Sequence, residues 1–223
     1  MDFNLNKEQE LLRDGLGKFL ATRYDLEKKS RTAAKIGPGW QPEIWRGLAD
    51  ELGILGAAFP ESVGGIGGGP VEIMVIAEEL GRALAIEPFI DTVVVAGGLL
   101  QRSDHPGAAV LLERIAEGSA IVALASTEPD TGGHAVSTKA VRAGDEWVIT
   151  GEKIVVTAAP LATHLLIVAR TSGEPDAAQG VSLFLTEFDP PTAPPPGLEV
   201  HSYRTIDDRR GADLTFDGLR LPA

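Results

Sequence analysis

The chain has 223 residues, a formal net charge of −12 at pH 7 and no cysteine. This length can bury a substantial core and allows one large or two modest domains. The lack of thiols excludes disulfides, thiolate metal ligands and cysteine nucleophiles, and it fits a reducing compartment, so the cytoplasm is the expected location. The acidic charge argues against a nucleic-acid-binding surface, although a single pocket can still be locally basic.

Membrane and metal sites are not expected. No apolar run reaches the roughly 18 residues that a membrane span requires, and the N-terminal residues lack the basic and apolar regions of a signal peptide. The histidines do not have the spacing of metal ligands. They are His105, His134, His164 and His201.

The first 118 residues show helical periodicity. Between residues 6 and 29, apolar side chains recur on one face and charged side chains fill the other. Gly53 and Gly118 stand where helices should end. The expected helices cover residues 6–29, 42–52, 71–85, 89–101 and 106–117. We therefore predict an all-helical N-terminal domain over residues 1–118.

A glycine-rich segment from Gly64 to Gly69 invites comparison with a phosphate-binding loop. It lacks the Lys-Ser/Thr ending of such a loop, and no convincing buried strand precedes it. We interpret it as a turn before a helix, with Pro70 at the first helical position. In that helix, Glu78 and Glu79 are interpreted as a solvated face rather than as a general base.

The second half of the chain shows strand periodicity. At Ser119 the apolar period changes from about 3.6 to about 2. The strand that begins there should end at Pro129, since proline has no N–H for a β-ladder. Gly144–Asp145 has hairpin-turn chemistry, so we expect a β-meander across residues 119–157. Later strands are expected at 165–169, 181–185, 199–203 and 213–216. We predict a β domain over residues 119–223.

The polar crossover after the first strand is the best candidate for a binding site. Hydroxyl groups at Ser126, Thr127 and Thr131 stand beside Gly132 and Gly133, where unhindered backbone can approach a ligand closely. The crossover thus combines several hydroxyl donors with glycine. The crossover therefore predicts a ligand site at the end of the first strand.

The order of several motifs resembles the acyl-CoA dehydrogenase family. The motifs of its middle domain are Ser126-Thr-Glu-Pro129, the Gly132-Gly133 crossover, Ser137-Thr-Lys-Ala140 and Gly151-Glu-Lys-x-x-x-Thr157. The helical half carries Pro60-Glu-x-x-Gly-Gly-x-Gly67 and Glu78-Glu-Leu-Gly-Arg82, and residues 213–223 resemble the segment that leaves the family's β domain. The resemblance covers nearly the whole chain. The sequence is most similar to the small subunits of the pimeloyl-CoA dehydrogenase type.

This resemblance implies an α+β fold, in which an all-helical N-terminal domain precedes a β-barrel-like or β-sandwich middle domain. The family's C-terminal helical bundle, which carries the usual catalytic base, is missing from this chain, so we assign no catalytic residue. We expect that the chain is a piece of a longer protein or that a partner subunit supplies the rest. The implied activity is FAD-dependent α,β-desaturation of an acyl-CoA thioester.

The resemblance also implies site residues. Leu124, Ser126 and Thr127 match positions at the pyrimidine edge of the flavin, where a hydroxyl can donate to the ring as negative charge gathers on it. The segment Val155, Val156 and Thr157 matches positions that flank the flavin ring. The positions implied for substrate binding are Gly132, Gly133 and His134.

Three positions depart from the family pattern. Gly133-His134 stands where Ser-Asp is common, Val155 replaces an aromatic residue near the flavin, and Ala158 replaces asparagine. The lost ring-stacking area and the lost polar contact should each lower FAD affinity by on the order of 1 kcal/mol. For Thr127 and Thr157, the capping of strand ends is the alternative role.

Two other functions stay open. One is a non-catalytic structural or acyl-CoA-binding subunit of a heteromeric acyl-CoA dehydrogenase, with a degenerate flavin site. The other is a flavin-dependent monooxygenase on the same scaffold. The partners implied by the resemblance are an acyl-CoA thioester, electron-transfer flavoprotein as electron acceptor, and further subunits of a homo- or heterotetramer.

Overall fold

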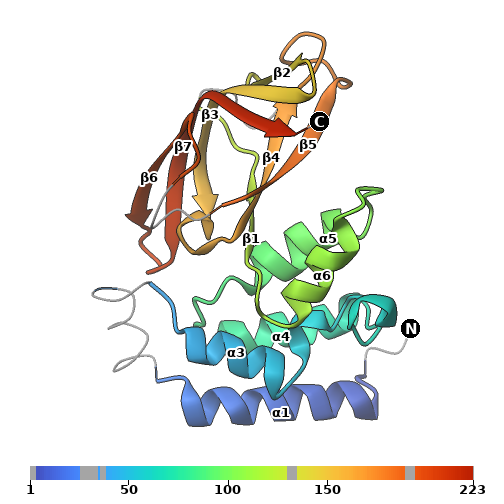
Figure 1. The fold of residues 1–223 in the computed structure, drawn as a ribbon. Coiled ribbons are helices and arrows are strands. Elements are labelled where there is room, and N and C mark those ends of the chain that lie inside the picture. Colours follow the sequence, from blue (N-terminus) through green and yellow to red (C-terminus); the bar gives the residue numbers. More distant parts are fainter. Residues whose placement is uncertain (1–3, 26–34, 36–38, 130–134, 189–193, 223) are drawn as a thin grey trace. The chain divides into compact units, whose positions relative to one another are not determined.

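A computed structural model of the chain describes residues 4–25, 35, 39–129, 135–188 and 194–222. The chain forms two compact units, Met1–Ala120 and Ile121–Ala223. The first unit is helical and the second is built around one curled sheet (Figure 1), which confirms the predicted α+β fold class. Within the described ranges, no helix has both the length and the hydropathy of a membrane span.

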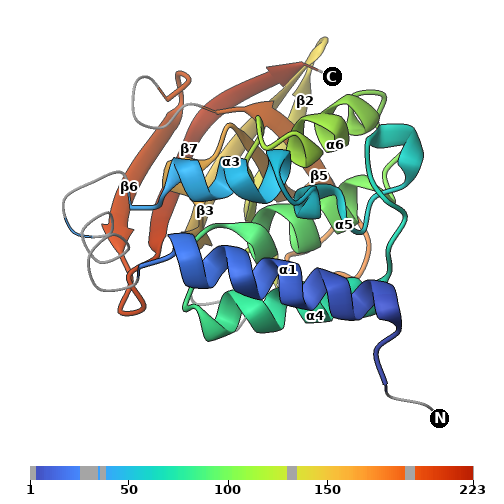
Figure 2. The same ribbon diagram turned by 90° about the horizontal axis from the view of Figure 1, so that it is seen from below.

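Where the structure describes it, the first unit consists of short and medium helices. They are α1 (Lys7–Arg23), α3 (Pro42–Asp50), the 3-10 helices η2 (Ile54–Gly56) and η3 (Glu61–Val63), α4 (Pro70–Arg82), the π-helix η4 (Ile90–Ala96), α5 (Gly97–Leu100) and α6 (Ala108–Ala116). Helices α1 and α4 lie side by side (Figures 1 and 2). A capping box starts α1, since the Asn6 side chain accepts the Gln9 N–H and the Gln9 side chain accepts the Asn6 N–H.

Two helix predictions need correction. The helix expected over residues 6–29 ends at Arg23, because Tyr24 leaves the helical conformation with ψ of 95°; residues 26–29 lie outside the described ranges. The single helix expected over 89–101 is instead a π-helix followed by a short α-helix. Its β-branched residues fall in the π segment, in line with their lower α-helix propensity.

The glycine-rich segment serves close backbone packing. A Cβ on Gly65 would lie 2.0 Å from the Phe59 carbonyl oxygen, and a Cβ on Gly68 would lie 2.5 Å from that of Ala57. Such contacts are available only to glycine. Pro70 occupies the first turn of α4, as predicted. The structure therefore explains these two glycines without a phosphate ligand.

Helix α4 ends in a Schellman motif with leucine at the left-handed position. Leu84 has φ of 52° and is 61% exposed, and the Ala85 N–H donates to the Leu80 carbonyl at 2.9 Å.

Replacement of Leu84 by glycine should raise the free energy of unfolding of this unit by about 1 kcal/mol, because the Cβ clash disappears. Urea unfolding measures this change. Leu84→Ala is the control, since alanine keeps the Cβ; an equal gain in both variants would contradict the explanation.

The described residues of the second unit form seven strands and one short helix. They are β1 (Val122–Ala125), β2 (Lys139–Ala143), β3 (Glu146–Thr157), the 3-10 helix η5 (Ala159–Leu161), β4 (His164–Arg170), β5 (Val181–Glu187), β6 (Leu198–Arg204) and β7 (Arg210–Pro222). The order in the sheet is β1-β4-β2-β3-β7-β6, and β5 pairs with β4. The two long strands β3 and β7 run beside each other and curve strongly (Figure 1).

The predicted β-meander is only partly correct. The hairpin at Gly144–Asp145 is confirmed, since β2 and β3 pair from Ala143 opposite Glu146. Strand β1, however, pairs in parallel with β4 and not with β2. A two-residue turn connects strands that pair with each other. The segment between β1 and β2 is long, so β1 can pair with whichever strand buries it best.

Candidate functional site

The structure brings the two predicted cofactor segments of the second unit together. The backbone carbonyl of Thr127, just beyond β1, accepts a hydrogen bond from the Ile154 N–H of β3 at 2.8 Å. The Ser126 carbonyl accepts from the Lys153 ammonium at 3.3 Å. The loop that follows β1 is therefore fixed along β3, immediately before Val155.

A buried ion pair holds this arrangement. Lys153 Nζ lies 2.6 Å from Glu128 Oε1, and the two side chains are 0% and 3% exposed. The Glu128 carboxylate also accepts the backbone N–H groups of Ser137 and Thr138, at 2.6 and 3.0 Å. The Glu128 carboxylate, which precedes the crossover, thus binds both the residues that follow the crossover and strand β3.

The protonation of the pair follows from its surroundings. Burial alone raises the pKa of Glu128, but the hydrogen bonds from Lys153, Ser137 and Thr138 outweigh it, so this pKa lies below its usual value. Burial lowers the pKa of Lys153, and the contact with Glu128 offsets part of that effect. Both groups are buried and hydrogen-bonded to protein partners, so the pair connects the crossover to β3.

Strand β3 carries a β-bulge directly after the lysine. Lys153 pairs with Leu214 and Val156 pairs with Ala212, so Ile154 and Val155 together face one residue of β7. In a regular strand, residues three apart point to opposite faces. Here Lys153 and Val156 are both buried, because the extra residue changes the phase of the alternation.

The predicted cofactor residues have distinct surroundings. Leu124 is half-buried in β1, and Ser126 and Thr127 are exposed at its end. Val155 is exposed with φ of 52°, whereas Val156 is buried. Thr157, half-buried, pairs with Gly211 of β7. The predicted substrate residues Gly132, Gly133 and His134 lie outside the described ranges.

These residues fit a flavin by their chemistry. All six cofactor positions carry uncharged side chains, and three of them are hydroxyls that can donate and accept hydrogen bonds. The exposed Ser126 and Thr127 could meet the polar edge of a ring. The side chain of Val156 is apolar and buried beneath the end of β3. In the part of the chain that the structure describes, no group of three or more His, Asp or Glu side chains could hold a metal ion.

The family motifs contain Glu128 and Lys153, but sequence reasoning assigned neither residue a role. The signal in the sequence was a charged residue at the start of an apolar run: Lys153 immediately precedes Ile154 and two valines. A lysine at such a position needs a buried partner. The sequence gives no distance between residues 128 and 153, so the partner could be identified only in the structure.

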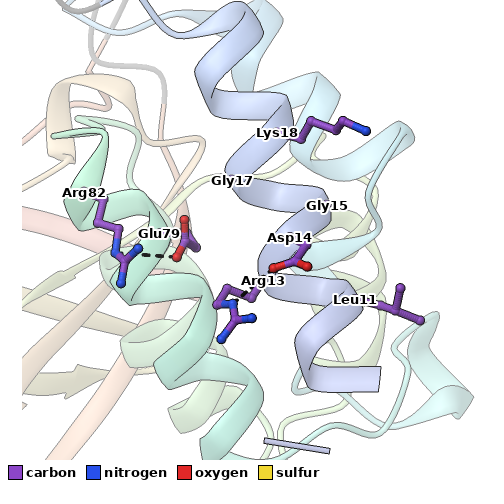
Figure 3. Close-up of a pocket in the computed structure, with 8 residues that line it drawn as sticks. All are labelled: Leu11, Arg13, Asp14, Gly15, Gly17, Lys18, Glu79 and Arg82. Atoms are coloured by element: carbon purple, nitrogen blue, oxygen red, sulfur yellow. Dashed lines mark hydrogen bonds and ion pairs between the residues drawn. The ribbon is translucent and has the colours of Figure 1, made fainter. Parts of the chain in front are cut away.

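A separate hollow of about 610 Å³ lies between α1 and α4 of the first unit (Figure 3). It contains none of the predicted site residues. Glu79 is buried there, 3.6 Å from the Arg82 guanidinium, and a Cβ on Gly17 would lie 2.9 Å from its carboxylate. The interpretation of Glu79 as solvated is therefore wrong, because α1 presents glycine at this contact and lets the carboxylate pack between the helices.

A helical unit followed by a curled, bulged sheet defines a fold of two compact units. The comparisons identify its class. The family model described as acyl-CoA dehydrogenase, N-terminal domain matches residues 6–119, and the one described as acyl-CoA dehydrogenase, middle domain matches residues 123–219. The chain belongs to the acyl-CoA dehydrogenase family, which confirms the resemblance seen in the sequence.

Individual relatives agree with this assignment. The chain is 31% identical to (2S)-methylsuccinyl-CoA dehydrogenase of Cereibacter sphaeroides, over 98% of this chain and 41% of the relative. It is 31% identical to cyclohex-1-ene-1-carbonyl-CoA dehydrogenase of Geobacter metallireducens, over 99% of this chain and 57% of the relative. The chain thus spans about half the length of the curated relatives it matches.

Solved structures show the same fold. A variant of the Tcur3481–Tcur3483 steroid ACAD matches with a TM-score of 0.82 and 31% identity, over 96% of this chain and 56% of that one. The ChsE4–ChsE5 complex from Mycobacterium tuberculosis matches with a TM-score of 0.84 and 27% identity, over 100% of this chain and 57% of that one.

Proposed function

We propose that the protein carrying this chain is an FAD-dependent acyl-CoA dehydrogenase that introduces an α,β double bond into an acyl-CoA thioester. The observation that carries the proposal is the hydrogen-bonded contact between the loop at Thr127 and the bulged end of β3 at Ile154. This contact places the two segments that the family resemblance assigns to the flavin next to each other. The catalytic base is assigned to no residue of this chain.

When bound, FAD would supply the acceptor for the substrate hydride. In this proposal Ser126 and Thr127 hold the polar edge of the ring with their hydroxyls, and Thr157 donates a hydrogen bond at the end of β3. Val155 provides apolar contact, whereas Val156 is 1% exposed and contributes only by packing behind the strand. Gly132, Gly133 and His134 contact the thioester and CoA. Electron-transfer flavoprotein as acceptor, a homo- or heterotetramer and a cytoplasmic location belong to the same proposal.

Visible absorbance of the full-length protein tests the activity. We expect a flavin band that is bleached anaerobically by at least one of butyryl-CoA, octanoyl-CoA and pimeloyl-CoA, with the enoyl-CoA as product. A flavin band that no acyl-CoA bleaches, but that yields a hydroxylated acyl-CoA when the flavin is first reduced with dithionite and oxygen is then admitted, would indicate a monooxygenase instead. Protein that has no flavin band, alone or with its partner subunits, would contradict both enzymatic functions.

A second candidate function is a non-catalytic subunit of a heteromeric acyl-CoA dehydrogenase. The observation in its favour is Val155, an exposed aliphatic side chain at the position where the family often has an aromatic ring. Two structural neighbours, whose names pair two proteins, are consistent with a heteromeric assembly. This function predicts binding of an acyl-CoA without any flavin band.

The proposed role of Thr127 makes a separate prediction. Thr127→Val keeps the shape of the side chain and removes its hydroxyl, so we expect the Kd for FAD to rise about five- to tenfold, the equivalent of one hydrogen bond. Titration of the flavin-free protein with FAD measures this change. Thr127→Ser keeps the hydroxyl and should stay within about twofold of the parent protein. Equal affinities for both variants would contradict the role.

A further inference from the structure

Val155 has a backbone conformation that its side chain disfavours. Its φ is 52°, in the left-handed region, which β-branched residues rarely adopt. Such a conformation persists only where surrounding contacts enforce it, and it is found most often at functional sites. The contacts of Val155 therefore need an explanation.

The contact that enforces the conformation comes from β7. The Val155 N–H donates to Asp213 Oδ1 at 2.9 Å. Asp213 is the one residue of β7 that faces the two bulged residues of β3, so its carboxylate supplies the acceptor that a regular ladder would have provided. Without this acceptor, the Val155 N–H would lose its hydrogen-bond partner. The shifted strand register at the bulge would then be less stable.

A tyrosine of β6 fixes the carboxylate in turn. The Tyr203 hydroxyl donates to the same Asp213 Oδ1 at 2.8 Å. A Cβ on Gly211 would lie 3.2 Å from the Tyr203 ring, so the ring lies against the residue that pairs with Thr157. Burial, followed by the bond to Asp213, raises the pKa of Tyr203, so the hydroxyl keeps its proton in neutral solution.

We infer that Asp213 and Tyr203 are positioning residues for the cofactor segment, which hold the bulge that buries Val156 and places Thr157 at the strand end. The inference rests on the proposed function. Tyr203 lies on β6 and Asp213 on β7, and neither strand carries a predicted cofactor residue. The contact of this pair with the cofactor segment is made through the backbone N–H of Val155, so its effect on the cofactor positions passes through that backbone.

Three variants of the full-length flavoprotein test the inference. Asp213→Ala removes the acceptor, Asp213→Asn keeps Oδ1, and Tyr203→Phe removes only the hydroxyl. We expect Asp213→Ala to raise the Kd for FAD about tenfold and to shift the visible flavin spectrum. Asp213→Asn should recover most of the affinity, and Tyr203→Phe should give a smaller change in the same direction. Glu146→Gln, at the other end of β3, is the matched control.

Amide hydrogen exchange provides a readout that needs no flavin. In a peptide covering residues 150–158, Asp213→Ala should speed exchange by about tenfold or more. Unchanged exchange would overturn the inference, as would faster exchange with an unaltered flavin spectrum and Kd. If the parent protein binds no flavin, the proposed function fails and this inference fails with it. A parent that binds flavin while all three variants match it overturns this inference alone.

Discussion

Replacement of Lys153 by methionine is expected to lower the free energy of unfolding of the second unit by about 3–5 kcal/mol. The lysine is fully buried, and its ammonium lies 2.6 Å from Glu128. Methionine fills much of the same volume but leaves the Glu128 carboxylate buried without its counter-charge. The loop at Ser126 also loses its hydrogen bond to Nζ, so the cofactor segments should separate. Hydrogen exchange of peptides from β3 and β7 in urea measures the loss.

The chain offers a matched control on the same two strands. Glu146 of β3 and Arg220 of β7 form an exposed ion pair at 2.8 Å, and Glu146→Gln should cost less than about 1 kcal/mol. The double variant Glu128→Gln/Lys153→Met removes both charges and should recover part of the loss. A cost for Lys153→Met similar to that of Glu146→Gln would show that the buried pair does not hold the site.

Because the pKa of Glu128 is depressed, its contribution to the free energy of unfolding should be present above about pH 4.5 and lost as the pH falls further.

Replacement of Glu87 by glutamine is expected to stabilise the first unit by about 3 kcal/mol at pH 8 and to have little effect near pH 4.5. Glu87 is 5% exposed. Its Oε1 accepts the backbone N–H of Gln41 at 3.2 Å, and its Oε2 has no hydrogen-bond partner among the described residues. Burial therefore raises the pKa of Glu87 to about 7.

The direction of the pH dependence follows from this raised pKa. Between pH 4.5 and about 7 the folded protein keeps a proton that the unfolded chain has lost. The free energy of unfolding should then fall as the pH rises through this range and level off above it. Urea unfolding at several pH values, monitored by hydrogen exchange of α3 peptides, measures this slope of the free energy of unfolding against pH. Glu113→Gln, an exposed substitution on α6, should keep the parental slope. A Glu87→Gln variant that also keeps it would rule out Glu87 as its source.

Local signals in the sequence predicted much of the fold. The change of apolar period near Ser119, the hairpin turn at Gly144–Asp145 and the position of Pro70 each depend on neighbouring residues only. The family motifs also gave two cofactor segments that the structure brings into contact. The role of each residue in those segments stays a prediction until a flavin is measured.

The sequence by itself therefore determined the division into a helical half and a β half, the family, and the segments proposed for the candidate site. Only the tertiary structure decided that Glu128 pairs with Lys153, that β1 lies beside β4, and that the Val155 N–H donates to Asp213. The physical reason is distance along the chain. Periodicity and turn chemistry act over a few residues, whereas a buried ion pair or a shift in strand register depends on which distant segments exclude water together.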